Sequence, residues 1–470
     1  MALTTDRQKG AHLLRRFGLG ASEAELDYYL KNGLEGAVDT LLNFDAIPEG
    51  FDLDVETMGN AKNNNLNPQA VAVWWAARML VTNRPLQEKM TLFWHNHFAT
   101  SGAKVLAGRL MHRQNEILRA NCTGNFRTML HEVSKDPAML FWLDNQYNVK
   151  GHPNENFARE VMELFTLGIG HYTEKDIQES ARAFTGWSIA RGNGRQIGQD
   201  GKGIKRGDAE FLFRPFQHDD GQKTYLGKSG NLNGDDCIDM LCEMPRTAFF
   251  LTKKLWEWFV YQSPEDATVQ KYADQFHASS LNIKLLLRHI MLSPEFYSER
   301  AERGVYKCPA DFVVGTMRQL GIGQMVARQM ADTTAVGPRR VGLAQVARQK
   351  MKSMGMDILY PPDVSGWSIG PAWVTTATMV ERIEWGAALF GPKSRVNYPV
   401  AGLVARDMTP RGLVAKLMSV FDAPLPPDKE RKLVDDATRE CGGQLTQQNI
   451  GATAAVVAKL IFASPEFQFA

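Results

Sequence analysis

Apolar and polar positions follow a helical spacing most clearly between Asn154 and Trp187. At about 100° per residue, the side chains from 155 to 165 divide into two arcs. The apolar arc holds Phe157, Ala158, Val161, Met162, Leu164 and Phe165, and the polar arc holds Glu155, Asn156, Arg159, Glu160 and Glu163. Gly168 predicts the end of this helix, and Thr173 followed by acidic residues predicts the cap of a second one. We therefore expect a helix pair in which the first helix packs its apolar arc against the core and leaves its polar arc available for a functional role.

Helical patterns also cover residues 11–17, 71–80, 85–98, 107–120 and 126–134, and most of the chain after Asp235. A β-hairpin is predicted only at residues 210–227, where the strands FLFRPF and KTYLG flank an HDDGQ turn. Between Trp187 and Pro215, six glycines stand among basic residues and predict a long loop, either a lid or a disordered excursion. The chain is thus predicted to be a mainly α-helical, multi-helix, two-lobed globular protein with one small β-hairpin.

Four segments are predicted. Residues 1–190 form an N-terminal helical lobe with the candidate site, residues 191–234 an insertion with the Gly-rich basic loop and the hairpin, residues 235–336 a helical subdomain, and residues 337–470 a C-terminal helical subdomain. The last segment weakly repeats residues 235–298, because LLLRHIMLSPEFYS at 285–298 aligns with VVAKLIFASPEFQF at 456–469. Two copies are too few for a solenoid, so a duplicated subdomain is the safer inference.

Composition excludes several classes of function. The 470 residues include 54 Lys and Arg against 52 Asp and Glu, and a net charge of +2 gives no overall field toward nucleic acid. Five cysteines without a CxxC pair argue against a disulfide framework or a zinc knuckle and predict buried thiols. No stretch reaches the roughly 18 apolar residues of a membrane span, and the first residues lack an apolar signal region. As written, the sequence predicts a soluble, cytoplasmic protein.

The carboxylates of the polar arc are the first candidate chemistry. Glu155, Arg159 and Glu163 follow one another at i,i+4 steps, which is the spacing of a salt-bridge ladder on a solvated face. If this face instead lines a cleft, Glu160 and Glu163 become a catalytic acid pair whose pKa values separate. The substrate-binding candidates of this region are Asn156, Arg159 and Arg182.

Histidines are the second candidate chemistry. His95 follows Glu88 by seven residues on the same side of the predicted helix, where a carboxylate would fix the imidazole tautomer. His97 points away from His95 and is interpreted as buried and hydrogen-bonded, since sharing a metal ion would require the helix to unwind at Asn96. His218 lies at the tip of the predicted hairpin. We expect His95 or His218 to shuttle protons, and the mixed oxygen and nitrogen donors would suit a divalent metal ion as cofactor.

Two further clusters are candidates for ligand contacts. His12, Arg15 and Arg16 lie within about one helical turn, where they either bind an anion or pair with acids, and Arg16 is assigned to substrate binding. Trp367 and Trp373 belong to the Pro- and Gly-rich loop PPDVSGWSIGPAW. They either offer aromatic platforms to a sugar or peptide or fill a seam between lobes.

Five motifs occur in order along the chain: HLLRRFGLGAS, QEKMTLFWHNHFATS, the Asn154–Trp187 segment, HDDGQKTYLGKSGNLNGDD and YPPDVSGWSIGPAW. Together they resemble the bacterial DUF1800 family, a domain of unknown function, over nearly the whole chain. The resemblance implies a periplasmic or extracellular role, since members often carry export signals, and a sulfatase-like partner protein. Many members have histidine where Phe165 stands, so a site built on that imidazole would be altered in this chain.

Two functions remain open at this stage. The first is a hydrolase or transferase that acts on a polymeric or phosphorylated substrate through carboxylate, arginine and histidine side chains. The second is a non-catalytic helical scaffold that binds a partner protein or a polysaccharide. The enzyme requires the polar arc to share a pocket with His95 or His218, whereas an arc open to solvent favours the scaffold.

Overall fold

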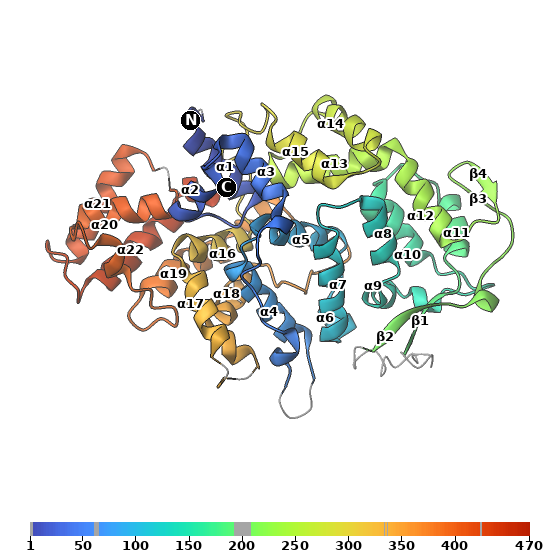
Figure 1. The fold of residues 1–470 in the computed structure, drawn as a ribbon, viewed down its shortest axis with the longest axis horizontal. Coiled ribbons are helices and arrows are strands. Elements are labelled where there is room, and N and C mark those ends of the chain that lie inside the picture. The colour runs from blue at the N-terminus through green and yellow to red at the C-terminus, as the bar shows by residue number, and fades with distance from the viewer. Residues whose placement is uncertain (1–2, 61–64, 192–207, 333, 336, 424) are drawn as a thin grey trace.

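The computed structural model describes all residues except 1–2, 61–64, 192–207, 333, 336 and 424. Over the described residues the protein is mainly α-helical, which confirms the predicted class. The Gly-rich basic loop predicted from the sequence lies largely outside the described residues. In Figure 1 the helices follow one another from a central group to the right-hand end, back over the top, and then to the left-hand end.

The N-terminal helices form the centre of the molecule and the beginning of its right-hand end (Figure 1). They are α1 (Asp6–Phe17), α2 (Glu23–Leu30), α3 (Gly33–Leu42), α4 (Pro68–Val81), α5 (Pro85–His97), α6 (Gly102–Val105), α7 (Gly108–Ala120), α8 (Phe126–Ser134) and α9 (Pro137–Trp142). Their boundaries follow local chemistry, since α2 begins with a reciprocal capping box between Ser22 and Glu25 and α5 begins with Pro85 in its first turn.

The right-hand end contains the helix pair predicted between Asn154 and Trp187. Its elements are α10 (Glu155–Glu160), a π-helix (Val161–Thr166), α11 (Glu174–Ala183) and, after the strands, α12 (Gly234–Glu243). Gly168, with φ +80°, ends the first helix, and Thr173 forms a capping box with Asp176 at the start of α11. Both predicted helix boundaries are confirmed.

The C-terminal helices form the top, the lower centre and the left-hand end in Figure 1. They are α13 (Pro245–Phe259), α14 (Asp266–Ala278), α15 (Ile283–Met291), α16 (Pro309–Gln319), α17 (Ile322–Ala331), α18 (Gly342–Ser353), α19 (Thr376–Phe390), α20 (Pro410–Val420), α21 (Pro427–Glu440) and α22 (Ile450–Ala463).

The predicted β-hairpin at 210–227 has its strands in the expected places but the wrong partners. β1 (Trp187–Arg191) pairs antiparallel with β2 (Ala209–Phe213), and β3 (Lys223–Tyr225) pairs antiparallel with β4 (Lys228–Gly230). Leu226 and Gly227 both have positive φ, which is the geometry of a two-residue type I′ hairpin turn. The Leu-Gly pair therefore turns the chain between β3 and β4, where the sequence pattern predicts the end of a strand.

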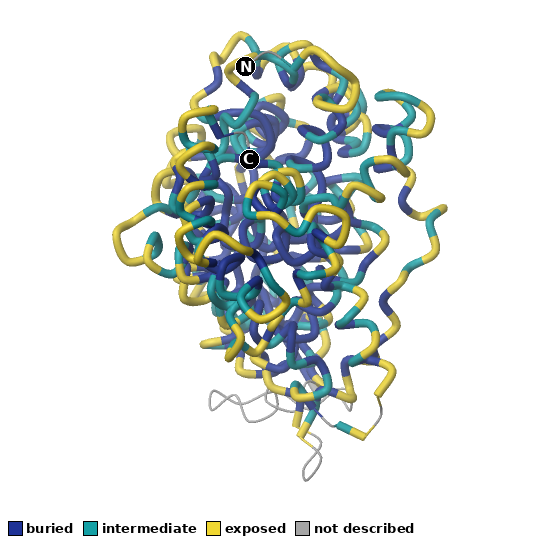
Figure 2. The backbone as a smooth tube through the Cα atoms, turned by 90° about the vertical axis from the view of Figure 1, so that its left-hand side faces the viewer, coloured by how far each residue is buried: buried dark blue, intermediate teal, exposed yellow. Residues whose placement is uncertain are grey.

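The core is continuous through the centre of the molecule, where Figure 2 shows the buried backbone concentrated. Helix α5 lies inside this core and is buried on nearly every side, including Glu88, Lys89, His95 and His97. Buried polar groups require partners, so this helix depends on polar contacts that its neighbours supply. All five cysteines are buried free thiols, as predicted.

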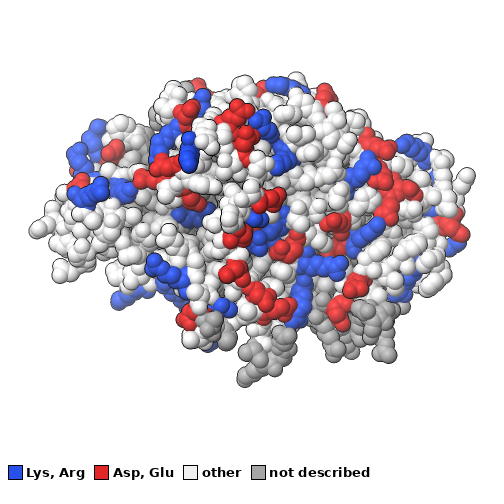
Figure 3. Space-filling model, in the orientation of Figure 1, with Lys and Arg blue, Asp and Glu red and all other residues white. Residues whose placement is uncertain are grey.

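The surface carries charges of both signs. On the face drawn in Figure 3, acidic and basic side chains alternate without a single-signed field, in agreement with the near-neutral net charge. Within the described part of the chain, no helix combines the length and apolar character needed to cross a lipid bilayer.

Candidate functional site

The polar arc of α10 forms ion pairs at the protein surface. Arg159 donates to both carboxylate oxygens of Glu174, at 3.0 and 2.9 Å, and to Glu155 at 3.4 Å. The Arg159 side chain is 35 % exposed and that of Glu174 is 70 % exposed. Hydrogen bonds to Glu174 raise the pKa of Arg159 above its ordinary value. The first step of the predicted ladder is present, but Glu163 accepts a hydrogen bond from Tyr172 at 2.5 Å instead of extending it.

Glu160 is half-buried beside this ladder. Burial, followed by the charge of Glu163, raises the pKa of Glu160, and Arg159 opposes the shift. The assignment of Glu160 and Glu163 as a catalytic acid pair stays a prediction. Asn156, by contrast, donates to the main-chain oxygen of Leu143 at 3.1 Å, a contact that connects α10 to the end of α9.

Arg182 on α11 connects the helix pair to the loop that follows β2. Its guanidinium donates to Asp219 at 2.8 and 3.2 Å and to Glu179 at 2.9 Å. The hydrogen bonds from Arg182 lower the pKa of Asp219 to about 2. In the same loop, the ring of His218 hydrogen-bonds through Nδ1 to the main-chain oxygen of Thr185 at 2.9 Å. Arg182 and His218 therefore fix the position of this loop.

The π-helix Val161–Thr166 is a feature that the helical pattern does not predict. The Thr166 hydroxyl donates to the Val161 oxygen at 2.7 Å, and the wide turn directs later main-chain oxygens toward α5 and α13. Phe165 O contacts His97 Nε2 at 3.1 Å, Leu167 O accepts from Arg246 at 2.9 Å, and the Lys254 ammonium lies 3.5 Å from Leu164 O. These contacts satisfy oxygens that a π-turn leaves without helical partners.

The contacts at the π-helix confirm the interpretation of His97, and they reveal Lys254 as a further residue of interest. His97 is buried and hydrogen-bonded, as expected. Lys254 has no sequence signal that distinguishes it, yet burial lowers the pKa of its ammonium to about 8. Short π-helical insertions often occur at functional sites. The turn therefore makes this segment a candidate functional site, but it indicates no reaction.

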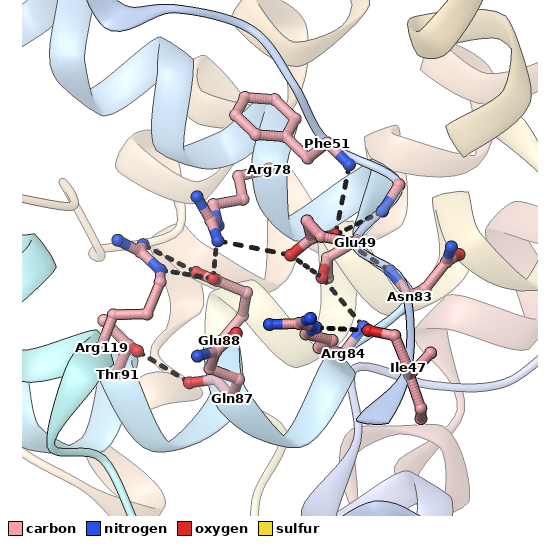
Figure 4. Close-up of polar contacts among 12 residues, drawn as sticks. Ile47, Glu49, Phe51, Arg78, Asn83, Arg84, Gln87, Glu88, Thr91 and Arg119 are labelled. Atoms are coloured by element: carbon pink, nitrogen blue, oxygen red, sulfur yellow. Dashed lines mark hydrogen bonds and ion pairs between the residues drawn. The ribbon is translucent and has the colours of Figure 1, made fainter. Parts of the chain in front are cut away.

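The predicted pairing of His95 with Glu88 is wrong. Glu88 accepts a hydrogen bond from Trp75 at 2.8 Å. It also accepts from Arg78 at 2.8 Å and from Arg119 at 2.6 and 2.9 Å (Figure 4). His95 Nε2 is buried and has no hydrogen-bond partner among the described residues. Seven residues return a helix to the same side but also advance it by about 10.5 Å along the axis, which is too far for contact between the two side chains.

His95 has an apolar environment. Its ring meets the edges of Trp75 and Trp367 at centroid distances of 5.4 and 5.5 Å. Burial lowers the pKa of His95 to about 3, so the ring is neutral over the physiological range. At Glu88, burial has the largest effect and acts to raise the pKa, but the charge and hydrogen bonds of Arg119 hold it below its ordinary value. The structure therefore separates the two residues chemically as well as in space.

Arg16 is buried and occupied by main-chain oxygens. It is only 2 % exposed, and its guanidinium donates to the main-chain oxygens of Ala470, Val260 and Ala301. These contacts tie α1 to three other parts of the chain. The assignment of Arg16 to substrate binding stays a prediction.

Trp367 and Trp373 are each 5 % exposed, so they are not surface platforms. The main chain of Trp367 exchanges hydrogen bonds with the Asn96 side chain, at 2.6 and 3.5 Å. Of the two interpretations, burial favours a packing role for both rings, and the main chain of Trp367 holds the loop onto the end of α5.

A cavity of about 580 Å³ lies elsewhere, between α1, α2 and the end of α20. Arg15, Arg303 and Asp422 line it. This volume falls within the range of about 300–1,000 Å³ typical of small-molecule sites. The sequence signal that pointed here was the His12, Arg15 and Arg16 cluster, whereas Arg303 and Asp422 are distant in sequence and carried no signal.

The predicted site residues therefore lie in several places. Asn156, Arg159 and Glu160 lie on α10, and Glu163 lies on the π-helix that continues it. Arg182 lies on α11 and His218 in the loop after β2, whereas His95 and the two tryptophans are buried. No described contact joins His95 to His218 or to either glutamate. Among the described residues, no group of three or more His, Cys, Asp or Glu side chains is placed to hold a metal ion.

Comparison with protein families gives one match. The model of the DUF1800 family, described as a protein of unknown function, matches residues 12–469. Because this match spans nearly the whole chain, the protein belongs to the DUF1800 family. No curated protein and no solved structure was found to match the chain.

Proposed function

We propose that this DUF1800 family member is a non-catalytic helical protein that binds a partner protein. Its proposed contact surface, here called the aromatic rim, consists of Tyr147, Phe213, Phe216 and His218. The observation that carries the proposal is the exposure of Phe216, which is 80 % exposed, with Phe213 at 40 % and Tyr147 at 37 %. Aromatic side chains are enriched among the residues that dominate binding energy at protein interfaces.

The loop that carries Phe216 is fixed on both sides. Arg214 N donates to Gly186 O at 2.8 Å, Lys150 N donates to Gln217 O at 2.8 Å, and Asp219 N donates to the Thr185 hydroxyl at 2.7 Å. These bonds fix the main chain on both sides of the exposed Phe216 ring. A contact residue that is already in position loses less conformational entropy on binding.

Phe213, the last residue of β2, leads directly into this loop. The rings of Phe213 and His218 lie 5.5 Å apart between centroids. The segment with Tyr147 lies alongside, since Gly186 N donates to Asn148 O and Gly186 O accepts from Arg214 N. Ion pairs between Arg182 and Asp219 and between Lys150 and Asp220 border the loop. Protein interfaces commonly have such polar groups at the edge of an apolar contact.

The hydrolase or transferase alternative has less support. Its catalytic candidates Glu160 and Glu163 lie beside the exposed Arg159, and its histidines are not grouped with them. The raised pKa of Glu160 is the one observation that favours it. Turnover of a glycan or phosphoester that Glu160→Gln abolishes, at an unchanged melting temperature, would support an enzyme over a binding protein.

The first candidate partner is the sulfatase-like protein that the family resemblance suggests. The test measures its binding to the purified chain and to Phe216→Ser by biolayer interferometry. Loss of a central aromatic contact should weaken binding by about 10-fold or more, because such contacts contribute roughly 1–2 kcal/mol or more.

Val380→Ser is the matched control, since Val380 is 56 % exposed on α19, at the other end of the molecule. It should leave binding unchanged. Equal affinity of Phe216→Ser and the parent chain would exclude the aromatic rim as the contact surface. Retention of the chain on a polysaccharide column in a Phe216-dependent manner would assign the same surface to a polysaccharide instead.

A further inference from the structure

Helices α8 and α12 meet along two rows of opposite charge at the right-hand end of Figure 1. The basic residues Arg127, His131 and Lys135 follow one another at i,i+4 steps along α8 and its C-cap. They face Asp235 and Asp239, which are also four residues apart, on α12. Residues four apart lie on one side of a helix, so each row presents its charges to the other. The middle basic residue is the one whose charge changes near neutral pH.

His131 contacts both carboxylates of α12 at once. Its Nδ1 lies 3.0 Å from Asp235 Oδ1, and its Nε2 lies 2.9 Å from Asp239 Oδ1. An ionised carboxylate only accepts hydrogen bonds, and a neutral imidazole carries a single N–H, so the neutral ring can bond only one of the two. The imidazolium carries two N–H groups and can donate to both. The observed arrangement is therefore that of a protonated ring.

The two outer basic residues use the same carboxylate oxygens. Lys135 Nζ lies 2.6 Å from Asp235 Oδ1, and Arg127 donates to Asp239 Oδ1 at 3.1 Å. Each carboxylate is thus paired on one side with a side chain that stays charged at neutral pH and on the other side with His131. When the ring loses its proton, the outer pairs remain, and only the middle contact changes.

The position of His131 favours the charged ring. His131 lies in the last turn of α8, where the helix dipole stabilises a cation, and Asp235 lies in the first turn of α12, where the dipole stabilises an anion. The side chain of His131 is 24 % exposed. Hydrogen bonding to Asp235 has the largest effect and raises the pKa of His131, burial opposes the shift, and hydrogen bonding to Asp239 adds to the rise.

Other charged groups on the helices beside α8 have different partners. α7 and α9 also pack against α8, and α9, with the sequence PAMLFW, has no ionisable side chain. The side chain at its cap, Asp136, is bonded by Gln114. The ionisable side chains of α7 contact the following groups: Arg109 contacts Glu56, His112 contacts Glu116, Arg119 contacts Glu88, and Arg113 contacts the main-chain oxygen of Ala209. The remaining ionisable groups of α12 are Asp236, which accepts from Asn233 N, Glu243, which pairs with Lys228, and the buried thiols Cys237 and Cys242.

The start of α12 also packs against the sheet that leads into the aromatic rim. Gly234 lies so close to Trp187 on β1 that a Cβ at this position would be 2.5 Å from Trp187 Cζ2. The Lys135 ammonium lies 5.2 Å from the centroid of the same ring. β1 pairs with β2, which ends at the rim residue Phe213. A movement of α12 away from α8 would therefore disturb the support of this sheet.

We propose that His131, together with Asp235 and Asp239, is a pH-sensitive clasp between α8 and α12: the protonated ring joins both carboxylates and holds the helices together, and the neutral ring releases one of them. Folding raises the pKa of His131 above its ordinary value of 6.5. The stabilisation is therefore complete below about pH 6.5 and is lost as the pH rises through the raised pKa. The clasp goes beyond the proposed partner binding, and its tests use the chain alone, so either proposal can fail without the other.

Histidine NMR of the full chain tests the charge state of the clasp. With isotopically labelled histidine, the His131 ring signal is identified by its absence in His131→Gln, and its titration midpoint is expected above 6.5. Asp239→Asn should lower this midpoint, because a negative charge within about 4–6 Å favours the imidazolium. Asp274→Asn is the control, since Asp274 bonds Gln270 on α14 and should leave the midpoint unchanged. A midpoint at or below 6.5, or one that Asp239→Asn does not lower, would overturn the proposal.

Hydrogen–deuterium exchange tests the release of α12. After correction for the intrinsic pH dependence of exchange, the amides of α8 and α12 should exchange about 2–5-fold faster at about pH 8.5 than at about pH 5.5, the change expected for one partly exposed ion pair. His131→Gln should show the faster exchange at both pH values. His289→Gln, which replaces an exposed histidine on α15, should keep the profile of the parent chain. Exchange that does not change with pH in the parent chain, or a parent-like pH profile in His131→Gln, would contradict the clasp.

Discussion

Two arginine–carboxylate pairs in this protein share a geometry and differ in burial. Arg119 donates two hydrogen bonds to Glu88, at 2.6 and 2.9 Å, and Arg159 donates two to Glu174, at 3.0 and 2.9 Å. Glu88 and Arg119 are 0 % and 3 % exposed, whereas Glu174 and Arg159 are 70 % and 35 % exposed. The first pair lies in the core beside α5, and the second lies on the surface of the helix pair.

The difference shows that the pattern of charges along a helix does not reveal how much each ion pair contributes to the stability of the fold. In water, a paired charge has little to lose when its partner is removed, because solvent replaces the contact. In the core, the charge that remains is left without either solvent or partner. The polar arc of α10 is the more conspicuous pattern in the sequence. The buried contacts of Glu88 are the ones that we expect to contribute more to the stability of the fold.

The largest expected effect is at Glu88. Glu88→Gln would remove the buried carboxylate that Arg119 and Arg78 share, and it would leave them only their partly exposed partners Glu116 and Glu49. We expect a loss of about 3–5 kcal/mol in the free energy of unfolding, the usual cost of breaking a buried ion pair. Denaturant unfolding followed by circular dichroism measures it. A smaller loss than that of the surface variant Glu174→Gln would contradict the expected difference between the buried and the exposed pair.

Lys254 is an intermediate case, because it is a partly buried cation whose ammonium lies 3.5 Å from a main-chain oxygen. Its pKa is lowered from 10.5 to about 8, so between these values the unfolded chain holds more protons than the folded one. Stability from this residue therefore rises as pH increases from about 8 to 10.5 and is absent below that window.

The rise should amount to roughly 1–3 kcal/mol, since each unit of pKa corresponds to about 1.4 kcal/mol and residual solvation reduces the total. Unfolding experiments across that pH window, on the parent chain and on Lys254→Met, measure the effect as a difference, which cancels other titrating groups. A pH profile of Lys254→Met that matches the parent chain would show that Lys254 is not the group responsible.

The smallest effect is expected at Glu174. Glu174→Gln should change the free energy of unfolding by about 0.5 kcal/mol or less, because the pair is exposed and screened by salt. The same denaturant experiment measures it, at low and at high ionic strength. A loss comparable to that of Glu88→Gln would mean that the polar arc is sequestered in solution, and it would revive the interpretation of Glu160 and Glu163 as a site.

Features that depend on neighbours in sequence were predicted well. Gly168 and Thr173 end and begin helices where expected, since a left-handed residue and a capping hydroxyl act within a few positions. The buried state of His97 was predicted from its place on an apolar helix side. The strands near 210–227 were located, but their partners were not, because pairing depends on which residues form the turn, and Leu226 and Gly227 form it here.

Features that depend on distant contacts were not predicted. The oxygens of the π-helix are satisfied by His97, Lys254 and Arg246, which lie on other helices. The separation of His95 from Glu88 was missed because a helical wheel gives direction but not distance along the axis.

The helical class, the ends of the helix pair and the side chains that share a helix face could be predicted from the sequence, because these follow from local propensity and periodicity. Packing of the whole chain was needed to show which polar faces are buried, which arginines meet carboxylates or main-chain oxygens, and where Arg15, Arg303 and Asp422 line a cavity. Burial and long-range pairing set the strength of every charged contact, and both are properties of the packed chain.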